Sequence, residues 1–395
     1  MTRAVRIVLV AVSIVMSAAV AARAQAPPPL FVPGPSVPVG IGSGQLVLAD
    51  VNRDGHVDLI AQHLLRRLVQ VRLGDGTGRF STSRSRPLKL GYQAGAIAVG
   101  DLDKNGSLDL VVASRDHANE YIHVLPGADN GRFDTATAST WTVNQRFAFY
   151  KPKIRLLDVD EDSSLDIVTS NGRRNTIEIL LGESARSFVL APVVTLAPDQ
   201  DNHSYEPGDV DGDGHVDLVV VSRTEGRERA RLAVMRGNGN GAFAPAATTR
   251  AVLRGGQIVA LADLNRDRRL DVVLTHARSS RLSVLLNSGR GAFAPAPHSP
   301  YRLPAEAFAV VVADLNRDRR PDLVSATVDA EATGFAGRLA ELINKGRSFV
   351  PASGSPFRAG RGAYNLAVGD VDGDGRLDVA TSSFEGTRIG ILVGR

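Results

Sequence analysis

Short runs of apolar, often β-branched residues recur along the chain and predict β-strands rather than helices. Each strong run spans six or seven residues, is bounded by polar turns and has no convincing helical periodicity. A second apolar run follows, as at residues 68–74 and 176–182, and a Gly-rich turn then ends on Phe, as at 129–133. Another short apolar segment, such as residues 95–100, precedes the strong run. The pattern predicts an all-β chain with about four strands per repeat. The strong runs are residues 57–62, 108–114, 165–170, 216–222, 270–276, 321–327 and 377–383.

An acidic stretch leads into each strong run. The clearest copy, residues 209–217, reads DVDGDGHVD and has carboxylates at its first, third, fifth and ninth positions. Seven copies start at residues 50, 101, 158, 209, 263, 314 and 370, which are 51, 57, 51, 54, 51 and 56 residues apart. A unit of about 50 residues with four strands has the size of a propeller blade. The sequence therefore predicts a single seven-bladed β-propeller with four-stranded blades.

The Phe residues of the Gly-rich turns predict how the ring closes. Six of them precede the next acidic stretch by 20 to 25 residues, but only 25 residues follow Asp370 itself. Phe31 precedes Asp50 by 19 residues, as the other Phe residues precede their stretches. We therefore expect the N-terminal segment around Phe31 to supply the outer strand of the last blade.

The acidic stretches have the ligand chemistry of a calcium site. Carboxylates this close repel one another unless a cation lies among them, and oxygen-only ligation suits Ca²⁺. Side chains at positions 1, 3, 5 and 9 and the carbonyl of position 7 can converge on one ion, while Gly214 at position 6 permits the turn. An EF-hand is excluded because its twelfth position would be Val220, inside a strand.

The sequence thus predicts up to seven structural Ca²⁺ sites. The best-supported sites are in the copies that start at Asp209 and Asp370. The candidate ligands, including position 7 for its carbonyl, are Asp50, Asn52, Asp54, His56, Asp58, Asp101, Asp103, Asn105, Ser107, Asp109, Asp158, Asp160, Asp162, Ser164, Asp166, Asp209, Asp211, Asp213, His215, Asp217, Asp263, Asn265, Asp267, Arg269, Asp271, Asp314, Asn316, Asp318, Arg320, Asp322, Asp370, Asp372, Asp374, Arg376 and Asp378. Position 6 is Ser163, Arg268 and Arg319 in three copies, where a left-handed backbone strains the residue. The alternative, an acidic turn without an ion, is most credible for the two Arg copies.

The N-terminus predicts export. Arg3 and Arg6 precede an apolar stretch at residues 7–20, and Ala22 and Ala24 form a small-residue cleavage pattern. We expect a signal peptide at residues 1–24, a single propeller at 25–395, and a periplasmic, cell-surface or secreted protein; a permanent N-terminal anchor is the alternative. The chain has no Cys, so bound metal rather than disulfides would stabilise it.

Charge and hydropathy argue against nucleic-acid binding and against a second membrane-spanning segment. The net charge of +4 falls almost to zero once three Arg of the predicted signal are removed, which leaves 43 basic and 42 acidic residues. No basic run with interleaved aromatic residues occurs, which argues against nucleic-acid binding. No second apolar segment reaches membrane-spanning length.

The acidic stretch, the strand after it and turns such as GRGAFAPAP (residues 289–297) resemble the FG-GAP/VCBS repeat. This is the module of the integrin alpha-subunit propeller and of many exported bacterial proteins. The resemblance covers essentially the whole mature chain and implies calcium loops on one face and ligand docking on the other. Candidates there, in connections rich in Arg or aromatic residues, are Trp141, Arg146, Phe149, Tyr150, Arg173 and Arg174. Further Arg expected on that face are Arg66, Arg67, Arg115, Arg223, Arg227, Arg278 and Arg281.

No catalytic motif of the common hydrolases, P-loop enzymes or zinc proteases occurs in the sequence. The favoured interpretation is an exported, non-enzymatic binding or adhesion module for a protein or an acidic glycan. Two alternatives stay open: a polysaccharide-active lyase or hydrolase with its site in the same loops, and a purely structural cell-surface protein.

Overall fold

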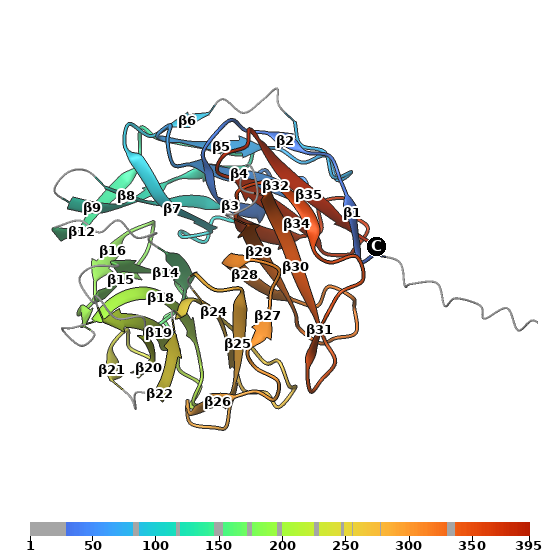
Figure 1. Cartoon of the computed structure of the whole chain (residues 1–395). Helices are drawn as coiled ribbons and strands as arrows, with labels where there is room; N and C mark the ends of the chain where they lie inside the picture. The colour runs from blue at the N-terminus through green and yellow to red at the C-terminus, as the bar shows by residue number, and fades with distance from the viewer. Residues whose placement is uncertain are drawn as a thin grey trace, which may run out of the picture.

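Seven small antiparallel sheets are arranged around a common axis in the computed structural model of the chain (Figure 1). The structure describes residues 29–395, apart from 82–86, 116–118, 146–152, 172–175, 196–199, 225–228, 246–248, 255, 277 and 330–335. Throughout these residues the regular structure is β-strand, and no helix occurs. The prediction of an all-β, seven-bladed propeller is confirmed.

Blades 1 to 6 each run from an inner strand to an outer strand in chain order, whereas blade 7 takes its outer strand from the N-terminus. Blade 1 contains β3 (Ser43–Ala49), β4 (Asp58–His63), β5 (Leu68–Arg72) and β6 (Leu88–Lys89). Blade 2 contains β7 (Gln93–Gly100), β8 (Asp109–Arg115), β9 (Asn119–Leu125) and β12 (Ser139–Gln145), with the small hairpin β10 (Gly127–Ala128) and β11 (Arg132–Phe133). Blade 3 contains β13 (Ile154–Leu157), β14 (Asp166–Asn171), β15 (Thr176–Gly182), β16 (Phe188–Leu190) and β17 (Val194–Thr195).

In blades 4 to 7, as in blade 3, the outer strand consists of two short pieces, and both pair with the third strand of the blade. Blade 4 contains β18 (Gln200–Gly208), β19 (Asp217–Thr224), β20 (Arg229–Gly237), β21 (Phe243–Pro245) and β22 (Thr249–Arg254). Blade 5 contains β23 (Gly256–Ala262), β24 (Asp271–His276), β25 (Arg281–Asn287), β26 (Phe293–Pro295) and β27 (Tyr301–Arg302). Blade 6 contains β28 (Glu306–Ala313), β29 (Asp322–Asp329), β30 (Ala336–Asn344), β31 (Phe349–Pro351) and β32 (Phe357–Arg361). Blade 7 contains β33 (Ala363–Gly369), β34 (Asp378–Ser383), β35 (Arg388–Gly394), β1 (Phe31–Pro33) and β2 (Val37–Pro38).

The N-terminal segment closes the ring, as the Phe spacing predicts. In blade 7, β1 and β2 pair with β35, and Phe31 stands opposite Gly394. The Phe31 ring is 1% exposed and makes an edge contact with Phe357, with the ring centroids 6.0 Å apart. Figure 1 shows the blue N-terminal strand beside the red C-terminal blade. Ring closure leaves no open edge between the first and last blades.

The hydrophobic core lies between the blades. The second strand of a blade is buried on both sides, as β24 shows, which explains why these runs are continuously apolar rather than alternating. Clusters combine neighbouring blades: Val219 of β19 packs with Val272 and Leu274 of β24. Each blade is therefore stable only in contact with the next, as in other repeat architectures.

The predicted signal peptide, residues 1–24, lies outside the described residues, so export stays a prediction. Over the part of the chain that is described, no helix is long and apolar enough to cross a membrane.

Candidate metal centres

Each acidic stretch forms the loop between the first and second strands of a blade. Because all blades repeat the same strand order around one axis, the seven loops lie on the same face of the ring. The loops are numbered by blade: loop 1 (residues 50–58), loop 2 (101–109), loop 3 (158–166), loop 4 (209–217), loop 5 (263–271), loop 6 (314–322) and loop 7 (370–378).

The first Asp of each loop organises the turn around itself. In loop 4 the Asp209 carboxylate accepts hydrogen bonds from the backbone N–H of Gly212 (2.7 Å) and Gly214 (3.0 Å). The bond from the sixth-position N–H recurs in all seven loops at 2.7–3.0 Å. The seven loops therefore share one backbone path even where their side chains differ.

The ninth Asp of each loop has a second role that the sequence interpretation missed. In loop 4, Asp217 is fully buried and accepts hydrogen bonds from the N–H of Val210 and of Gly237, both at 3.0 Å. The same two bonds recur in every blade, so this carboxylate ties the loop to the end of the third strand. One signal was available in the sequence: position 9 is Asp in all seven copies, whereas positions 3, 5 and 6 vary.

Burial makes these ninth-position carboxylates costly to ionise. Burial, with a smaller contribution from the charges of neighbouring loop carboxylates, raises their pKa to about 6 in five loops. The pKa of Asp217 is raised for the same reasons. A cation among the carboxylates would favour the ionised form. The five residues are Asp58, Asp166, Asp271, Asp322 and Asp378.

Two positions of each loop have a left-handed backbone. Position 6 has this conformation even where it is not Gly, with φ of 67° at Arg268 and 64° at Arg319, so the predicted strain is present. Position 4 is also left-handed, at φ of 84° in Gly212 and 65° in Arg266, which the sequence interpretation did not foresee. A non-Gly residue in this region costs about 1–2 kcal/mol.

Carboxylates converge in three loops of the described chain. Ligand oxygens of Asp158, Asp160 and Asp166 lie within 4.8 Å of one another, as do those of two further sets. In loop 3, Asp158 Oδ1 is buried without a hydrogen-bond partner. Such sets could hold a metal ion, and their all-oxygen donors fit Ca²⁺. The other sets are Asp209, Asp211 and Asp217 in loop 4, and Asp370, Asp372 and Asp374 in loop 7.

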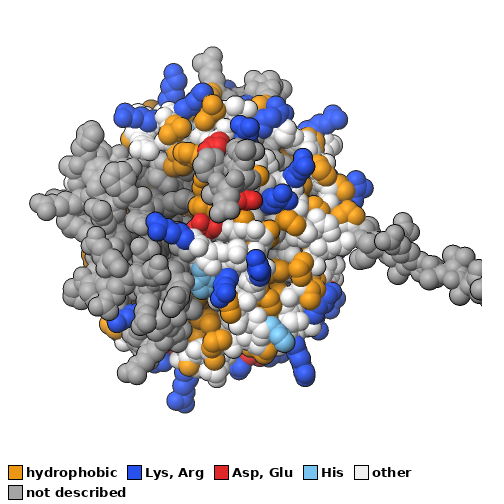
Figure 2. All heavy atoms as spheres, viewed as in Figure 1, with side chains coloured by type: hydrophobic (Ala, Val, Ile, Leu, Met, Phe, Trp, Pro, Cys, Tyr) orange, Lys and Arg blue, Asp and Glu red, His pale blue; other side chains and the backbone are white. Residues whose placement is uncertain are grey.

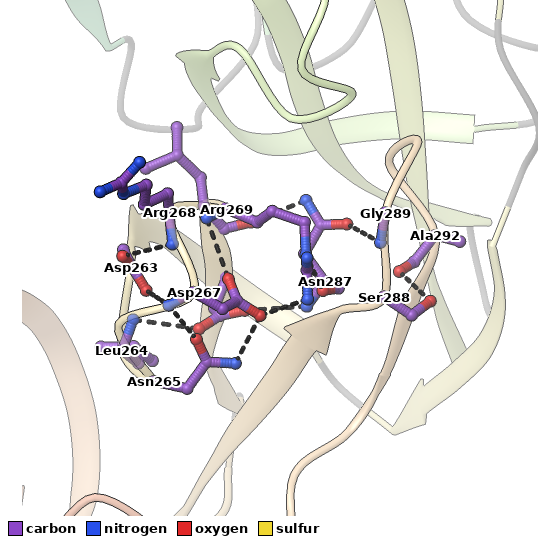
Figure 3. Close-up of polar contacts among 12 residues, drawn as sticks. Asp263, Leu264, Asn265, Asp267, Arg268, Arg269, Asn287, Ser288, Gly289 and Ala292 are labelled. Carbon is purple, nitrogen blue, oxygen red and sulfur yellow. Dashed lines mark hydrogen bonds and ion pairs between the residues drawn. The ribbon is translucent and has the colours of Figure 1, made fainter.

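Loops 5 and 6 differ in composition from loops 3, 4 and 7, because each contains three Asp and three Arg. In loop 5 the guanidinium of Arg269 pairs with Asp267 and also donates to the carbonyl of Asn287 at 2.8 Å (Figure 3). The amide of Asn265 donates to the same Asp267 carboxylate at 2.9 Å. An arginine thus supplies the positive charge, and this arrangement does not fit a calcium site.

Loop 2 also contains an arginine, but from the neighbouring blade. Arg186, in the turn before β16, forms ion pairs with Asp103 at 2.8 Å and Asp109 at 3.0 Å. The Asn105 amide donates to Asp103 at 3.1 Å. Two of the predicted ligands of loop 2 are therefore already neutralised by Arg186.

Position 4 links neighbouring loops on the same face. Arg266 of loop 5 donates to the carbonyls of Asp318 (2.8 Å) and Arg319 (3.1 Å) in loop 6. Arg317 of loop 6 donates to the carbonyl of Gly375 in loop 7. These contacts explain why long side chains tolerate a left-handed backbone at this position.

Six residues were candidates for binding a ligand on the face opposite the acidic loops. The structure describes one of them, Trp141, and corrects the prediction of where it lies. Trp141 lies within β12, not in a connection, and its ring meets Phe188 of blade 3 edge-on at 5.2 Å. It packs against the core cluster shared by blades 2 and 3. Trp141 therefore fills the space between blades 2 and 3 instead of lying in a docking connection. Arg146, Phe149, Tyr150, Arg173 and Arg174 lie outside the described residues.

The face opposite the loops is rich in basic side chains. Figure 2 shows a face where Lys and Arg are spread widely and few Asp or Glu are visible. Among the described residues, the exposed arginines at the connections between second and third strands, such as Arg67, Arg278 and Arg281, lie on the face opposite the loops. The loop face is not purely acidic, because the loops themselves contain nine Lys and Arg residues.

One polar cluster resembles a nucleophile–base pair. Ser114 Oγ lies 2.6 Å from His123 Nε2, and His123 Nδ1 lies 2.8 Å from Thr140 Oγ1. Ser114 and His123 are buried, and burial lowers the pKa of His123 to about 4. A second buried pair, His276 and Ser283, has the same contact at 2.8 Å in blade 5. The recurrence and burial of the pair indicate a hydrogen bond that joins strands, not a catalytic site.

The fold and the acidic loops together define a seven-bladed propeller built from calcium-loop-like repeats. A model of the FG-GAP-like repeat matches residues 50–112, 158–220, 209–274 and 263–325, more than half of the chain. The chain therefore belongs to the FG-GAP-like repeat family.

Solved structures share this fold at low sequence identity. The structure of BBS1N in complex with ARL6DN, soaked with mercury, has a TM-score of 0.60 and 14% identity, and the match covers 93% of this chain and 98% of that chain. A lead-soaked form of the same complex gives a TM-score of 0.59, at the same identity and coverage. An Agrocybe aegerita lectin that recognises non-reducing terminal N-acetylglucosamine has a TM-score of 0.51, 18% identity and coverage of 79% and 80%. No curated protein matches the chain significantly.

Proposed function

We propose that this protein is an exported β-propeller, stabilised by calcium, that binds a protein or an acidic glycan through the face opposite its acidic loops. The observation that carries the proposal is the division of the ring into two faces. The three converging carboxylate sets lie on one face, and exposed arginines of the described residues, such as Arg67, Arg278 and Arg281, lie on the other.

Calcium has a structural role in this proposal. In loops 3 and 4 the converging carboxylates come from both ends of a loop that joins two strands, so an ion there would hold the strands together, whereas in loop 7 they come from its first five residues. The ninth Asp, which already links the loop to the third strand, extends that effect across the blade. An ion held by the oxygens of one such loop would join its strands rather than act on a substrate.

The opposite face suits recognition because its connections are varied in sequence and are held by a rigid ring. Two structural neighbours are consistent with this use of the fold: BBS1N is in a complex with ARL6DN, and the lectin recognises a sugar. Their identities are too low to transfer a ligand, so the chemistry of this chain has to name it.

A glycan array screened in calcium, followed by an assay for cleavage of each bound glycan, tests the proposal. Binding without product release is the expected result. Product release would identify a polysaccharide-active enzyme instead. Failure to bind any glycan, together with failure to retain any protein from its own secreted fraction, would favour a purely structural role.

A further inference from the structure

In three consecutive blades, an arginine of the third strand stands directly opposite an arginine of the outer strand. At the start of the third strand, Arg281 of β25 stands opposite Arg302 of β27 in blade 5. In blade 6, Arg338 of β30 stands opposite Arg358 of β32. In blade 4 the backbone register places Arg229 opposite Arg254. All three pairs lie toward the face opposite the acidic loops, because third strands begin there.

The remaining four blades have other residues at this place. Their pairs are Leu68 and Lys89, Asn119 and Gln145, Thr176 and Thr195, and Arg388 and Pro38. In the last of these, the Arg388 guanidinium is held by Ser36, with both hydrogen bonds at 2.6 Å. The paired arginines are therefore a property of blades 4 to 6 and not of the repeat.

Such pairs are unfavourable in the unliganded protein. Residues directly opposite in an antiparallel pair have Cβ atoms about 4.5–5.5 Å apart, and like charges there repel. The side chains of Arg281, Arg302, Arg338 and Arg358 are exposed, and none forms an ion pair with a described residue. Arg361 adds another exposed charge in the strand pair of blade 6, and it too has no ion pair with a residue that the structure describes. An anion bound between the paired arginines would compensate these charges.

The blade 5 pair lines an open cavity. Ser280, Arg281, Pro300 and Arg302 surround a volume of about 470 Å³. Two guanidinium groups can each offer parallel N–H donors to one carboxylate or sulfate, which is the geometry arginine favours. No aromatic ring is among these four residues, whereas single-stranded nucleic-acid sites use rings to stack bases.

We propose that the paired arginines of blades 5 and 6 bind a linear acidic polysaccharide, with one anionic group seated between Arg281 and Arg302. This proposal rests on the proposed binding function and names its ligand class and its residues. Blades 5 and 6 are neighbours in the ring, as the positions of β25, β27 and β30 in Figure 1 show, and each contains one pair. A polymer with a charge on each sugar can therefore contact both pairs at once, which a single acidic sugar cannot.

The test is a binding titration of the full chain, in calcium, with polygalacturonate, heparin and neutral dextran, and with single-stranded DNA as a separate arm. The two acidic polymers distinguish carboxylate from sulfate. The first variant combines R281Q and R302Q, and the second combines R338Q and R358Q. The matched control combines R132Q and R347Q, two exposed arginines in the Gly-rich turns on the loop face that have no ion pair with a described residue.

We expect an acidic polysaccharide to bind, dextran not to bind, and affinity to fall as salt rises. Each pair variant should weaken binding about tenfold, whereas the control should change it less than twofold, as expected when charge-assisted hydrogen bonds are lost. Unchanged circular dichroism and melting temperature would show that the variants fold. Binding that survives both pair variants would overturn this site but leave the proposed function standing. Tighter binding of the DNA would overturn the ligand class, and binding of none of these polymers would overturn the inference while the glycan array still tests the wider function.

Discussion

Single residues that break the repeat show where this chain departs from its own pattern. Glu341 stands opposite Val324 in blade 6, at a place where the other six blades have Val or Ile. It is fully buried, and neither carboxylate oxygen has a hydrogen-bond partner. Burial, with the nearby charge of Asp322, raises the pKa of Glu341 to about 8. The side chain is therefore neutral in the folded protein at neutral pH.

This predicts a pH-dependent loss of stability. The unfolded chain releases the Glu341 proton near its ordinary pKa of 4.5, whereas the folded chain holds it up to about pH 8. The free energy of unfolding should therefore fall as pH rises through this window and level off above it. Between about pH 5.5 and pH 7.5, wild type should lose about 2 kcal/mol more than Glu341→Val in urea unfolding. Glu341→Gln serves as the polar, non-titrating control, and equal slopes in all three proteins would contradict the assignment.

Arg268 is a second residue in conflict with its backbone. Its φ of 67° is left-handed, and the corresponding residue in loop 4 is Gly214. Arg268→Gly should raise the free energy of unfolding by about 0.5–1 kcal/mol, because relief of strain exceeds the added freedom of the unfolded chain. Arg347→Gly, at an exposed turn position without a positive φ, should lower it. A loss of similar size in both variants would show that the left-handed backbone at Arg268 is not strained.

At the scale of the element, one loop shape has two ways to balance its carboxylates. Loops 3 and 4 have net charges of −5 and −4, whereas three Asp and three Arg cancel in loops 5 and 6. The backbone hydrogen bonds to the first and ninth Asp are nevertheless the same. The loop fold therefore does not require an ion, and charge decides which loops can hold one.

A matched pair of double variants tests this division. In loops 4 and 7 the combination Asp213→Ala with Asp374→Ala removes the fifth ligand, and Asp267→Ala with Asp318→Ala removes the same residue from loops 5 and 6. All four carboxylates accept the same hydrogen bond from position 7, at 2.8–2.9 Å. Asp267 also loses its contacts with Arg269 and Asn265, so the comparison uses the difference between calcium and EGTA rather than the total loss of stability. At a hundredfold excess over Kd, each site adds roughly 2.7 kcal/mol.

The first combination should thus remove roughly 5 kcal/mol of the calcium-dependent stabilisation, and the second should leave it intact. The measurement is the unfolding free energy with calcium and with EGTA. A melting curve that EGTA does not change in wild type would contradict calcium binding altogether. Equal losses in both combinations would contradict the division between loops.

At the scale of the whole molecule, closure of the ring depends on residues that are the most distant in sequence. Phe31 pairs across from Gly394 just as Phe349 pairs across from Asn344 within blade 6. Contacts between the termini continue at Arg395, whose N–H donates to the carbonyl of Leu30 at 2.9 Å. Strand β1 thus supplies the outer strand of blade 7, which in the other blades follows the third strand through a turn.

Phe31→Ala should therefore destabilise the propeller by about 3–5 kcal/mol, the usual cost of removing a buried Phe side chain. Phe349→Ala is the matched control, since it removes the same group from a blade made of contiguous sequence and should cost a similar amount. Urea unfolding of the two variants checks this. A negligible effect of Phe31→Ala beside a large effect of Phe349→Ala would show that the N-terminal segment does not close the ring.

The repeat in the sequence determined the blade number, the four-strand blades, the strand after each acidic loop and the closing strand at Phe31. These features depend on local apolar patterns and on spacing, which the linear sequence contains in full. The turn at position 6 was also predictable, because Gly recurs there in four loops.

Only the tertiary structure decided which side chains meet. Arg186 reaches Asp103 and Asp109 from another blade, and nothing in the motif of loop 2 indicates it. Trp141 lies in a strand between two blades because the outer strand of blade 2 is longer than its sequence suggests. Charge balance in a loop, and whether an aromatic ring is core or surface, depend on residues brought together by packing around the ring, and that arrangement exists only once the blades have assembled.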